Sequence, residues 1–259
     1  MYQGFNLDIE GNDFSDFYEI GKKIHKMNKK SVKKDIESLK GDDGILMAEK
    51  ITAKWFSEIE ADVFLSHSHK NKEEVVGLSG WLSENFGVHA FIDSCVWGRS
   101  DHLLKLIDDA YCLNNSRGTY NYKKRNRSTS HVYMMLSVAL TKMINRCDCI
   151  IFVNTPQSIS VKNSIGAKGD ITYSPWIYHE IMTTGLIKKQ RKSDRFRTID
   201  EARVKNDSMD LSVQYDVDLS HLTDVTFSDL QDIAHKHKDI EKSKLGRVSL
   251  SDLYGIRGK

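Results

Sequence analysis

Short apolar segments alternate with helical patterns in the middle of this chain, and no other feature constrains its fold as much. The clearest apolar segment is CDCIIFVNTP at 147–156, which ends in polar residues as a buried parallel strand does. VFLS at 63–66 and VHAFID at 88–93 have the same form. Helical spacing of apolar residues occurs at 70–85, 101–111, 130–146 and 174–187. This alternation predicts an α/β fold with a doubly wound parallel sheet.

The N-terminal region is predicted to lie outside this sheet. A chain of 259 residues is long enough for one large domain, or for one domain with an appendage, since roughly 150 residues per domain are usual. An amphipathic pattern at 14–39 and a second helical pattern at about 45–59 predict an N-terminal helical extension over residues 1–60. The core domain is then expected within residues 61–190.

Residues 191–259 are predicted to form a C-terminal extension that packs on the core or completes it. SVQYDV at 212–217 has the pattern of a strand, and FSDLQDIAHKH at 227–237 has that of a helix. The stretch KKQRKSDRFRT at 188–198 is basic with little apolar content, which is typical of a solvated loop or extension.

The overall composition argues against membrane and nucleic-acid partners. The net charge is only +2, no apolar run is long enough to span a bilayer, and the first residues, MYQGFNLDIEG, lack the pattern of a signal peptide. The four cysteines form no C-x-x-C pair and no zinc spacing, which fits a reducing compartment. We therefore expect a cytoplasmic protein with no membrane contact and no direct nucleic-acid contact.

Polar residues follow each predicted strand, at the edge where doubly wound sheets bind their ligands. In chain order these candidates are Ser66, His67, His69, Asp93, Ser94, Asn154 and Thr155. Their placement locates a site at the carboxyl ends of the strands, but it does not identify the chemistry of that site.

Two kinds of ligand are considered for this edge. His67 and His69 have the H-x-H spacing that can place two imidazoles on one metal ion, as in metal-dependent hydrolases. No H-x-x-x-H, H-E-x-x-H or paired Asp/His group elsewhere completes a metal site, so a role as polar loop residues is favoured and no metal is expected. The Gly-rich turn of dinucleotide-binding folds and the G-x-x-x-x-G-K-[ST] loop are also absent. This leaves open the binding of a nucleotide as a substrate.

Two further segments carry an aromatic residue or a cluster of cations. An exposed Trp97 in the loop at 93–99, beside Gly98 and Arg99, would stack on a flat ring or meet a partner surface. The alternative is that Trp97 packs against the neighbouring helix. NYKKRNRSTS at 121–130 is predicted to be a basic loop, either solvated or anion-binding. Its cations are Lys123, Lys124, Arg125 and Arg127.

The stretch SPWIYHEI at 174–181 places a carboxylate among aromatic and apolar residues. Ser174 is suited to cap a helix, and Pro175 to occupy its first position. Glu180 then follows Trp176 by one helical turn. On this pattern alone, the favoured interpretation of Glu180 is a solvated helix residue beside a buried Trp.

The chain resembles a bacterial TIR (Toll/interleukin-1 receptor) domain, particularly the TIR-like proteins of Thoeris anti-phage systems. The resemblance covers about residues 60–190 and rests on four segments in order, ADVFLSHSHKNKEEV, VHAFIDSCVWG, CDCIIFVNTP and SPWIYHEI. It implies a flavodoxin-like sheet of five parallel strands, an exposed loop after the second strand and, in enzymatic members, cleavage of the nicotinamide–ribose bond of NAD. The family's W-x-x-x-E pattern falls on Trp176 and Glu180, which implies that Glu180 is the catalytic carboxylate.

The resemblance also implies the rest of the site and the biological role. The substrate-binding residues expected from it are Ser66, His67, Asp93, Trp97 and Trp176. It implies an NAD-consuming enzyme of anti-phage defence that produces a cyclic or linear ADP-ribose-type signal for a partner effector. NAD is then a substrate and no cofactor is expected, and the protein is expected to self-associate through TIR surfaces. The alternatives are a non-catalytic TIR–TIR interaction module that uses the Trp97 loop and a metal-dependent hydrolase built on the H-x-H pair.

Overall fold

The chain is organised around one parallel sheet. A computed structural model describes residues 3–28, 36–97, 100–114, 118–161, 170–187 and 215–256. Five strands form the sheet in the order β3-β2-β4-β1-β8, and every neighbouring pair is parallel. Their bounds are β1 Gln3–Asp8, β2 Val63–Ser66, β3 Ala90–Phe91, β4 Cys149–Asn154 and β8 Thr223–Thr226. The α/β class and the parallel sheet predicted from the sequence are confirmed.

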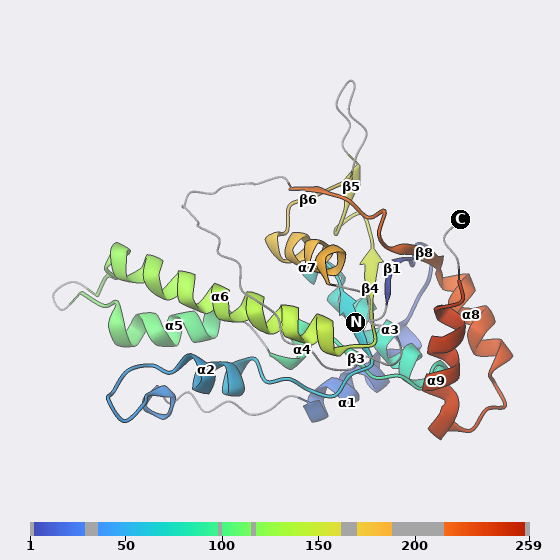
Figure 1. The fold of residues 1–259 in the computed structure, drawn as a ribbon, viewed down its shortest axis with the longest axis horizontal. Coiled ribbons are helices and arrows are strands. Elements are labelled where there is room, and N and C mark those ends of the chain that lie inside the picture. The colour runs from blue at the N-terminus through green and yellow to red at the C-terminus, as the bar shows by residue number, and fades with distance from the viewer. Residues whose placement is uncertain are drawn as a thin grey trace.

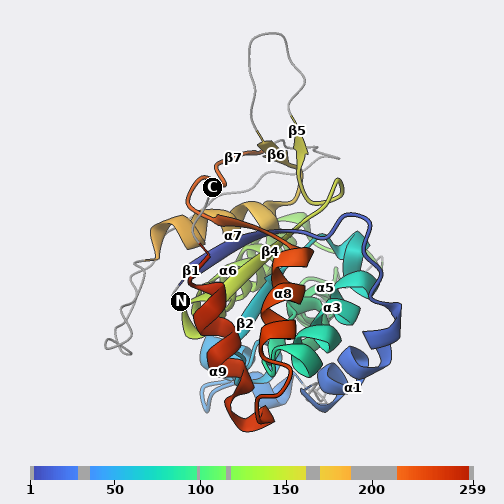
Figure 2. The ribbon, with the colours of Figure 1, turned by 90° about the vertical axis from the view of Figure 1, so that its right-hand side faces the viewer.

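Helices cover both faces of this sheet (Figures 1 and 2). One layer consists of α1 (Tyr18–Asn28), α3 (Lys72–Asn85), α8 (Phe227–Lys236) and α9 (Lys242–Leu253). The other layer consists of α2 (Ala48–Trp55), α5 (Ser100–Tyr111), α6 (Tyr122–Arg146) and α7 (Pro175–Leu186). The shorter helical segments are η1 (Ser15–Phe17), η2 (Glu37–Leu39), η3 (His69–Asn71) and α4 (Asp93–Val96). Across the described ranges, no helix has the length and apolar content needed to cross a membrane.

A small antiparallel sheet lies beyond the end of β4, at the top of Figure 1. It contains β5 (Ser160–Val161), β6 (Asp170–Thr172) and β7 (Tyr215–Val217) in that order. The described part of the strand predicted at 212–217 is therefore β7 of this small sheet. The basic stretch at 188–198 lies outside the described residues.

Apolar side chains on both faces of β4 explain why this strand lies between two helix layers. Ile151 and Val153 face the first layer, whereas Ile150 and Phe152 face the second, because successive side chains of a strand point to opposite faces. All four side chains are buried. A strand without a polar face must be covered on both sides, and the helices supply that cover.

The N-terminal region contributes a strand to the sheet, so the predicted helical extension over residues 1–60 is wrong at its start. β1 pairs with β4 on one side and with β8 on the other. Its apolar residues Phe5 and Leu7 are fully buried, but Gly4 and Asn6 interrupt the apolar run. Pairing with strands far along the chain defines β1 more than its own residues do.

α1 is also part of the main body of the protein. It crosses α3 so closely that a Cβ atom on Gly21 would lie 1.9 Å from the carbonyl oxygen of Val76. A Cβ atom on Gly80 would lie 2.2 Å from the carbonyl oxygen of Phe17. Only glycine fits at such backbone contacts, so these residues let the two helices share one layer.

The strand order matches the flavodoxin order at its first three positions and departs from it at the last two. Counted from β2, the strands β3-β2-β4 reproduce the flavodoxin order 2-1-3. The next position is held by the N-terminal β1 and the last by β8, so strands from outside residues 61–190 complete the sheet. The order still reverses between β2 and β4, which brings the carboxyl ends of β2, β3 and β4 to one edge.

The basic segment at 121–130 is helical, so the prediction of a loop is wrong. α6 begins at Tyr122, and the side chain of Asn121 caps it by accepting a hydrogen bond of 3.1 Å from the backbone N–H of Lys124. Lys and Arg are good helix formers, and α6 contains neither Gly nor Pro. The cations therefore extend the apolar helix predicted at 130–146 by two turns.

Candidate functional site

Glu180 lies in α7, close to the carboxyl end of β2. The start of α7 matches its sequence signals, because the Ser174 hydroxyl accepts a hydrogen bond of 3.3 Å from the N–H of Ile177 and Pro175 opens the helix. Glu180 is only 4% exposed. The prediction of a solvated Glu180 is therefore wrong, because this face of α7 packs against the sheet.

Ser66 is the hydrogen-bond partner of this carboxyl group. It is the last residue of β2, it is buried, and its hydroxyl donates a hydrogen bond of 2.5 Å to Glu180 Oε2. One hydroxyl replaces only part of the water shell of a carboxylate, so ionisation of Glu180 here costs free energy. The fold thus brings together two residues that the sequence predicts for one site.

The surroundings of Glu180 favour its protonated form. Burial raises the pKa of this carboxyl group well above its ordinary value, and the negative charge of Asp93 raises it further. The hydrogen bond from Ser66 lowers the pKa, but it is the smallest of the three effects. Asp93 is half-buried at the start of α4, soon after β3. These surroundings therefore disfavour the ionised form of Glu180, and a positive charge brought to this place would favour it.

His67 contributes a buried polar atom without a partner. Its ring is 7% exposed, and Nδ1 lies 3.4 Å from the carbonyl oxygen of Leu65, which is long for a hydrogen bond. Nε2 has no hydrogen-bond partner among the described residues. Burial lowers the pKa of His67, and the negative charge of Asp93 opposes this only in part. The result is a neutral imidazole with one unused nitrogen.

Two other predicted residues lie beside these groups. The Ser94 hydroxyl, next to Asp93, is also buried without a partner in the described part of the chain. The ring of His69 meets that of His67 edge-to-face, with centroids 6.0 Å apart. Among the residues that the structure describes, no three His, Cys, Asp or Glu side chains are grouped so as to hold a metal ion.

Trp97 is buried in the second layer, so the prediction of an exposed aromatic is wrong and the packed alternative is correct. Its side chain is 6% exposed. Its ring meets those of Phe56 and Phe91 edge-to-face, with centroids 5.7 and 4.9 Å away, and its Nε1 donates a hydrogen bond of 2.9 Å to the carbonyl oxygen of Ser57. A substrate ring would reach Trp97 only after these contacts had opened.

The predicted loop at 93–99 is mostly helical in the part that the structure describes. Its first four residues form α4, which the sequence did not predict. Gly98 and Arg99, which follow Trp97 in this loop, lie outside the described residues. The structure therefore assigns this segment a packing role through Trp97.

Trp176 supports the helix that carries Glu180. It is half-buried, and its ring meets that of Tyr133 in α6 edge-to-face, with centroids 5.6 Å apart. One turn further on, His179 Nε2 lies 3.2 Å from the Thr141 hydroxyl of α6. These contacts hold α7 against α6 and so help to fix the position of Glu180.

Hydrogen bonds of Thr155 fix the turn that follows β4. The Thr155 hydroxyl donates a hydrogen bond of 2.8 Å to Asn71 Oδ1, and the Thr155 N–H donates one of 2.9 Å to Ser158 Oγ. These bonds close the turn after β4 and tie it to η3. Thr155 is therefore engaged in structure, and Asn154 beside it is half-buried.

Sequence reasoning missed His25, which lies in α1. Its ring is buried, and its Nε2 lies 2.9 Å from the Ser79 hydroxyl of α3. Burial, together with the nearby Lys72 and His67, lowers the pKa of His25 to about 4. His25 of α1 therefore lies close enough to His67 to affect its surroundings. The sequence carried no signal for this proximity, because α1 was expected in an appendage.

Comparisons with protein-family models, with curated proteins and with solved structures found no match for this chain. The observations that bear on function therefore come from the residues at the carboxyl edge of the sheet. The pair formed by Glu180 and Ser66 is the most informative feature of that edge, because it buries an acid where α/β folds bind ligands.

Proposed function

We propose that this chain is an NAD-consuming enzyme of the TIR type, which cleaves the bond between nicotinamide and ribose. The observation that carries the proposal is the buried carboxyl group of Glu180, held by the Ser66 hydroxyl with Asp93 nearby. Acids whose pKa is strongly shifted by burial and by a neighbouring charge concentrate in active sites. The W-x-x-x-E spacing of Trp176 and Glu180 supports the same assignment.

The proposed reaction depends mainly on one carboxylate. Nicotinamide leaves NAD as a neutral ring from a cationic one, so no general acid has to protonate it, in contrast to most glycosidases. Positive charge then develops on the ribose in an oxocarbenium-like transition state. A carboxylate stabilises this charge most strongly where water is excluded, and Glu180 is almost closed off from solvent.

In this proposal the substrate supplies the charge that ionises Glu180. Burial and Asp93 favour the protonated carboxyl group in the absence of a ligand. The pyridinium ring of NAD brings a positive charge beside both acids, and a nearby opposite charge lowers the pKa of a carboxyl group. Binding of NAD therefore expels the proton of Glu180 and leaves the carboxylate that the reaction needs.

Neighbouring polar atoms are available to hold the ribose. His67 Nε2 and the Ser94 hydroxyl are buried and have no partner among the described residues. Both can form hydrogen bonds with ribose hydroxyls, which are donors as well as acceptors. The Ser66 hydroxyl, which now bonds Glu180, can stay with the carboxylate or turn to the sugar.

The wider role in the proposal follows the resemblance to TIR-like proteins of anti-phage systems. The enzyme acts in the cytoplasm of a bacterium and makes a cyclic or linear ADP-ribose-type signal that a partner effector reads. Self-association through TIR surfaces controls its activity. The alternative of a non-catalytic interaction module relied on an exposed Trp97, and the burial of this ring weakens that alternative.

The test is to incubate the purified full-length chain with NAD, alone and with lysate from phage-infected cells. Free nicotinamide and ADP-ribose products are followed by chromatography with mass detection. We expect Glu180→Gln to reduce nicotinamide release at least about a hundredfold, because it removes the charge that stabilises the transition state. Glu73→Gln is the matched control, since Glu73 is an exposed residue in the first turn of α3.

The product mass distinguishes hydrolysis from cyclisation. Equal nicotinamide release by the wild type and by Glu180→Gln would contradict the role of Glu180. The absence of release by either protein under both conditions would contradict the proposed enzyme as a whole.

A further inference from the structure

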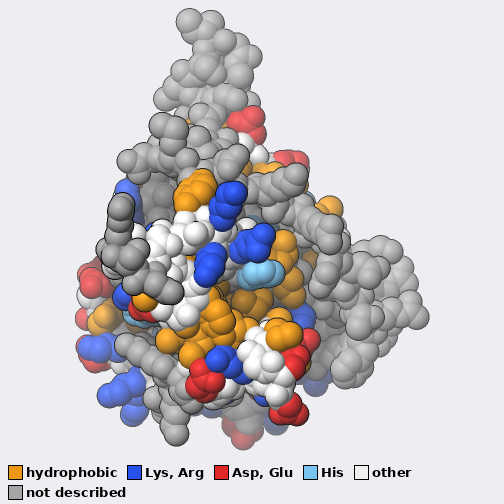
Figure 3. All heavy atoms as spheres, turned by 90° about the vertical axis from the view of Figure 1, so that its left-hand side faces the viewer, with side chains coloured by type: hydrophobic (Ala, Val, Ile, Leu, Met, Phe, Trp, Pro, Cys, Tyr) orange, Lys and Arg blue, Asp and Glu red, His pale blue; other side chains and the backbone are white. Residues whose placement is uncertain are grey.

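A cavity of about 300 Å³ lies where α5 and α6 meet the segment before α2. We call it the α5–α6 cavity. Its wall contains the apolar residues Leu46, Ile107 and Tyr111 and the basic residues Lys124, Arg127 and His131. Figure 3 views this end of the molecule and shows Lys, Arg and His side chains gathered at the border of a hydrophobic surface. The cavity shares no residue with the candidate site around Glu180.

Helix geometry explains how the two kinds of wall arise. Lys124, Arg127 and His131 are spaced by three and four residues, so they lie along one face of α6. Ile107 and Tyr111 are four residues apart in α5 and face the same cavity. The cations of the cavity wall therefore come from α6, and the apolar residues Ile107 and Tyr111 come from α5.

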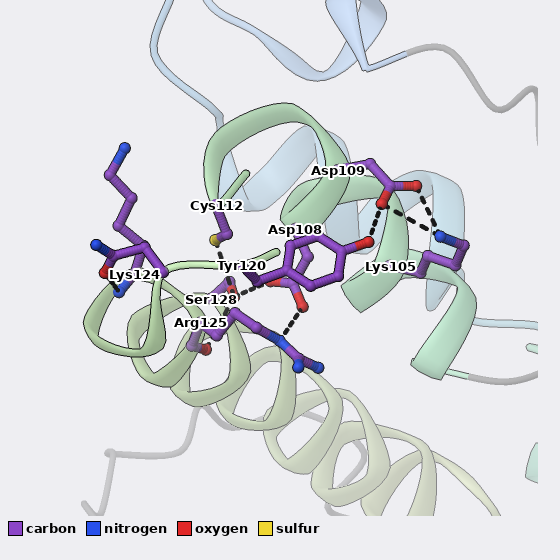
Figure 4. Close-up of polar contacts among 9 residues, drawn as sticks. Lys105, Asp108, Asp109, Cys112, Tyr120, Lys124, Arg125 and Ser128 are labelled. Carbon is purple, nitrogen blue, oxygen red and sulfur yellow. Dashed lines mark hydrogen bonds and ion pairs between the residues drawn. The ribbon is translucent and has the colours of Figure 1, made fainter. Parts of the chain in front are cut away.

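A buried ion pair fixes the α5–α6 hairpin beneath the cavity (Figure 4). Asp108 in α5 is 2% exposed, and Arg125 Nε donates a hydrogen bond of 2.9 Å to its Oδ2. The Ser128 hydroxyl donates to Oδ1 of the same carboxylate. The negative charge of Asp108 is therefore already compensated by Arg125 and Ser128.

The next carboxylate along α5 is engaged as well. Asp109 accepts a hydrogen bond from the Tyr120 hydroxyl and pairs with Lys105 Nζ at 3.0 Å (Figure 4). Arg125 lies over the Tyr120 ring, 5.1 Å from its centroid. Asp108 and Asp109 thus both have partners, and neither is left to balance the cations of the cavity.

The cations of the cavity have no such compensation. Within the described part of the chain, the side chains of Lys124, Arg127 and His131 make no ion pair and no hydrogen bond. Lys124 also lies in the first turn of α6, where the positive end of the helix dipole disfavours cations. An anion bound between Lys124 and Arg127 would interact favourably with both charges.

We propose that the α5–α6 cavity binds a small organic phosphate with a planar ring, of the size of a mononucleotide. Lys124 and Arg127 hold the phosphate, with His131 beside them, and the ring lies against Tyr111 and Ile107. A volume of about 300 Å³ is at the lower end of the range for ligand pockets, which matches a small ligand. Arg and Lys are the usual phosphate partners, and tyrosine offers a flat apolar face. This inference does not depend on the cleavage of NAD.

The test is titration calorimetry of the full-length protein with three probes: AMP, adenosine and inorganic phosphate. We expect saturable binding of AMP, with adenosine and phosphate each at least about tenfold weaker, because each lacks one half of the contacts. The double variant Lys124→Gln/Arg127→Gln should weaken AMP binding at least about tenfold. Lys142→Gln, an exposed position further along α6, is the matched control and should bind AMP as the wild type does.

Two further variants make the test specific. Tyr111→Ala should weaken AMP and leave inorganic phosphate unchanged. Glu180→Gln should bind AMP normally, because Glu180 does not line this cavity. The inference is overturned if AMP does not bind, if the double variant binds AMP as tightly as the wild type, or if phosphate alone binds as tightly as AMP.

Discussion

The Glu180 site and the α5–α6 cavity both hold polar groups that the fold leaves unsatisfied, but they differ in exposure. At the Glu180 site the groups are buried, and burial disfavours charge, since it raises the pKa of Glu180 and lowers that of His67. At the cavity Lys124 and Arg127 are exposed. The degree of burial therefore decides whether such a group keeps its charge. A buried group gives up its charge until a ligand restores it, whereas an exposed group keeps its charge and attracts a counter-ion.

The largest expected difference between the two regions is in stability. Trp97→Ala removes a buried ring that packs on Phe56 and Phe91 below the Glu180 edge, so we expect a loss of about 3–5 kcal/mol in the free energy of unfolding. Tyr111→Ala at the cavity removes a ring that is 40% exposed and should cost roughly 1 kcal/mol or less. Urea unfolding of both variants measures these two losses in the free energy of unfolding. Similar losses for the two would show that the cavity wall is as much a part of the core as Trp97.

A second difference concerns the pH dependence of stability. A carboxyl group with a raised pKa in the folded state stabilises the fold at low pH, and this contribution is lost as pH rises from the unfolded value of 4.5 through the folded pKa. Glu180→Gln removes that loss. We therefore expect the variant to gain stability relative to the wild type as pH rises above 4.5.

The urea midpoints of the wild type and of Glu180→Gln, measured at several pH values above 4.5, test this prediction. Lys124→Gln is the control from the other region, and its difference from the wild type should not change with pH. A constant difference between Glu180→Gln and the wild type would contradict a buried, protonated Glu180.

The smallest expected effect is the response to salt. The cations of the cavity are exposed, so dissolved ions screen them, and AMP binding should weaken a few-fold between about 50 and 300 mM salt. The hydrogen bond between Ser66 and Glu180 is shielded from solvent, so the ratio of NAD cleavage between wild type and Glu180→Gln should stay the same. Calorimetry and the nicotinamide assay at several salt concentrations provide this comparison. AMP binding that is independent of salt would indicate that Lys124 and Arg127 do not hold the phosphate.

Local signals in the sequence predict the part of the fold that depends on local structure. The apolar runs of β2 and β4 and the cap formed by Ser174 and Pro175 all appear where the sequence places them. The cap also fixes the helical register, so the position of Glu180 in α7 follows from it. The strand-end argument adds Ser66, because parallel strands share one carboxyl edge.

The features that the sequence did not predict depend on partners far along the chain. β1 is a strand because β4 and β8 pair with it, and its QGFNLD sequence has only two fully buried apolar residues. The burial of Trp97 depends on Phe56 and Phe91, which come from separate segments. The pKa of Glu180 is raised mainly because its side chain is buried, and no local sequence pattern predicts that burial.

The central claim is that a buried, protonated Glu180 becomes the catalytic carboxylate when a cationic substrate binds. The most direct measurement is calorimetric titration with carba-NAD, which keeps the pyridinium charge but resists cleavage, at pH 6 in buffers of different ionisation enthalpy. We predict that the wild type releases a proton on binding and that Glu180→Gln does not. Equal proton exchange by the two proteins, or none by either, would contradict the claim.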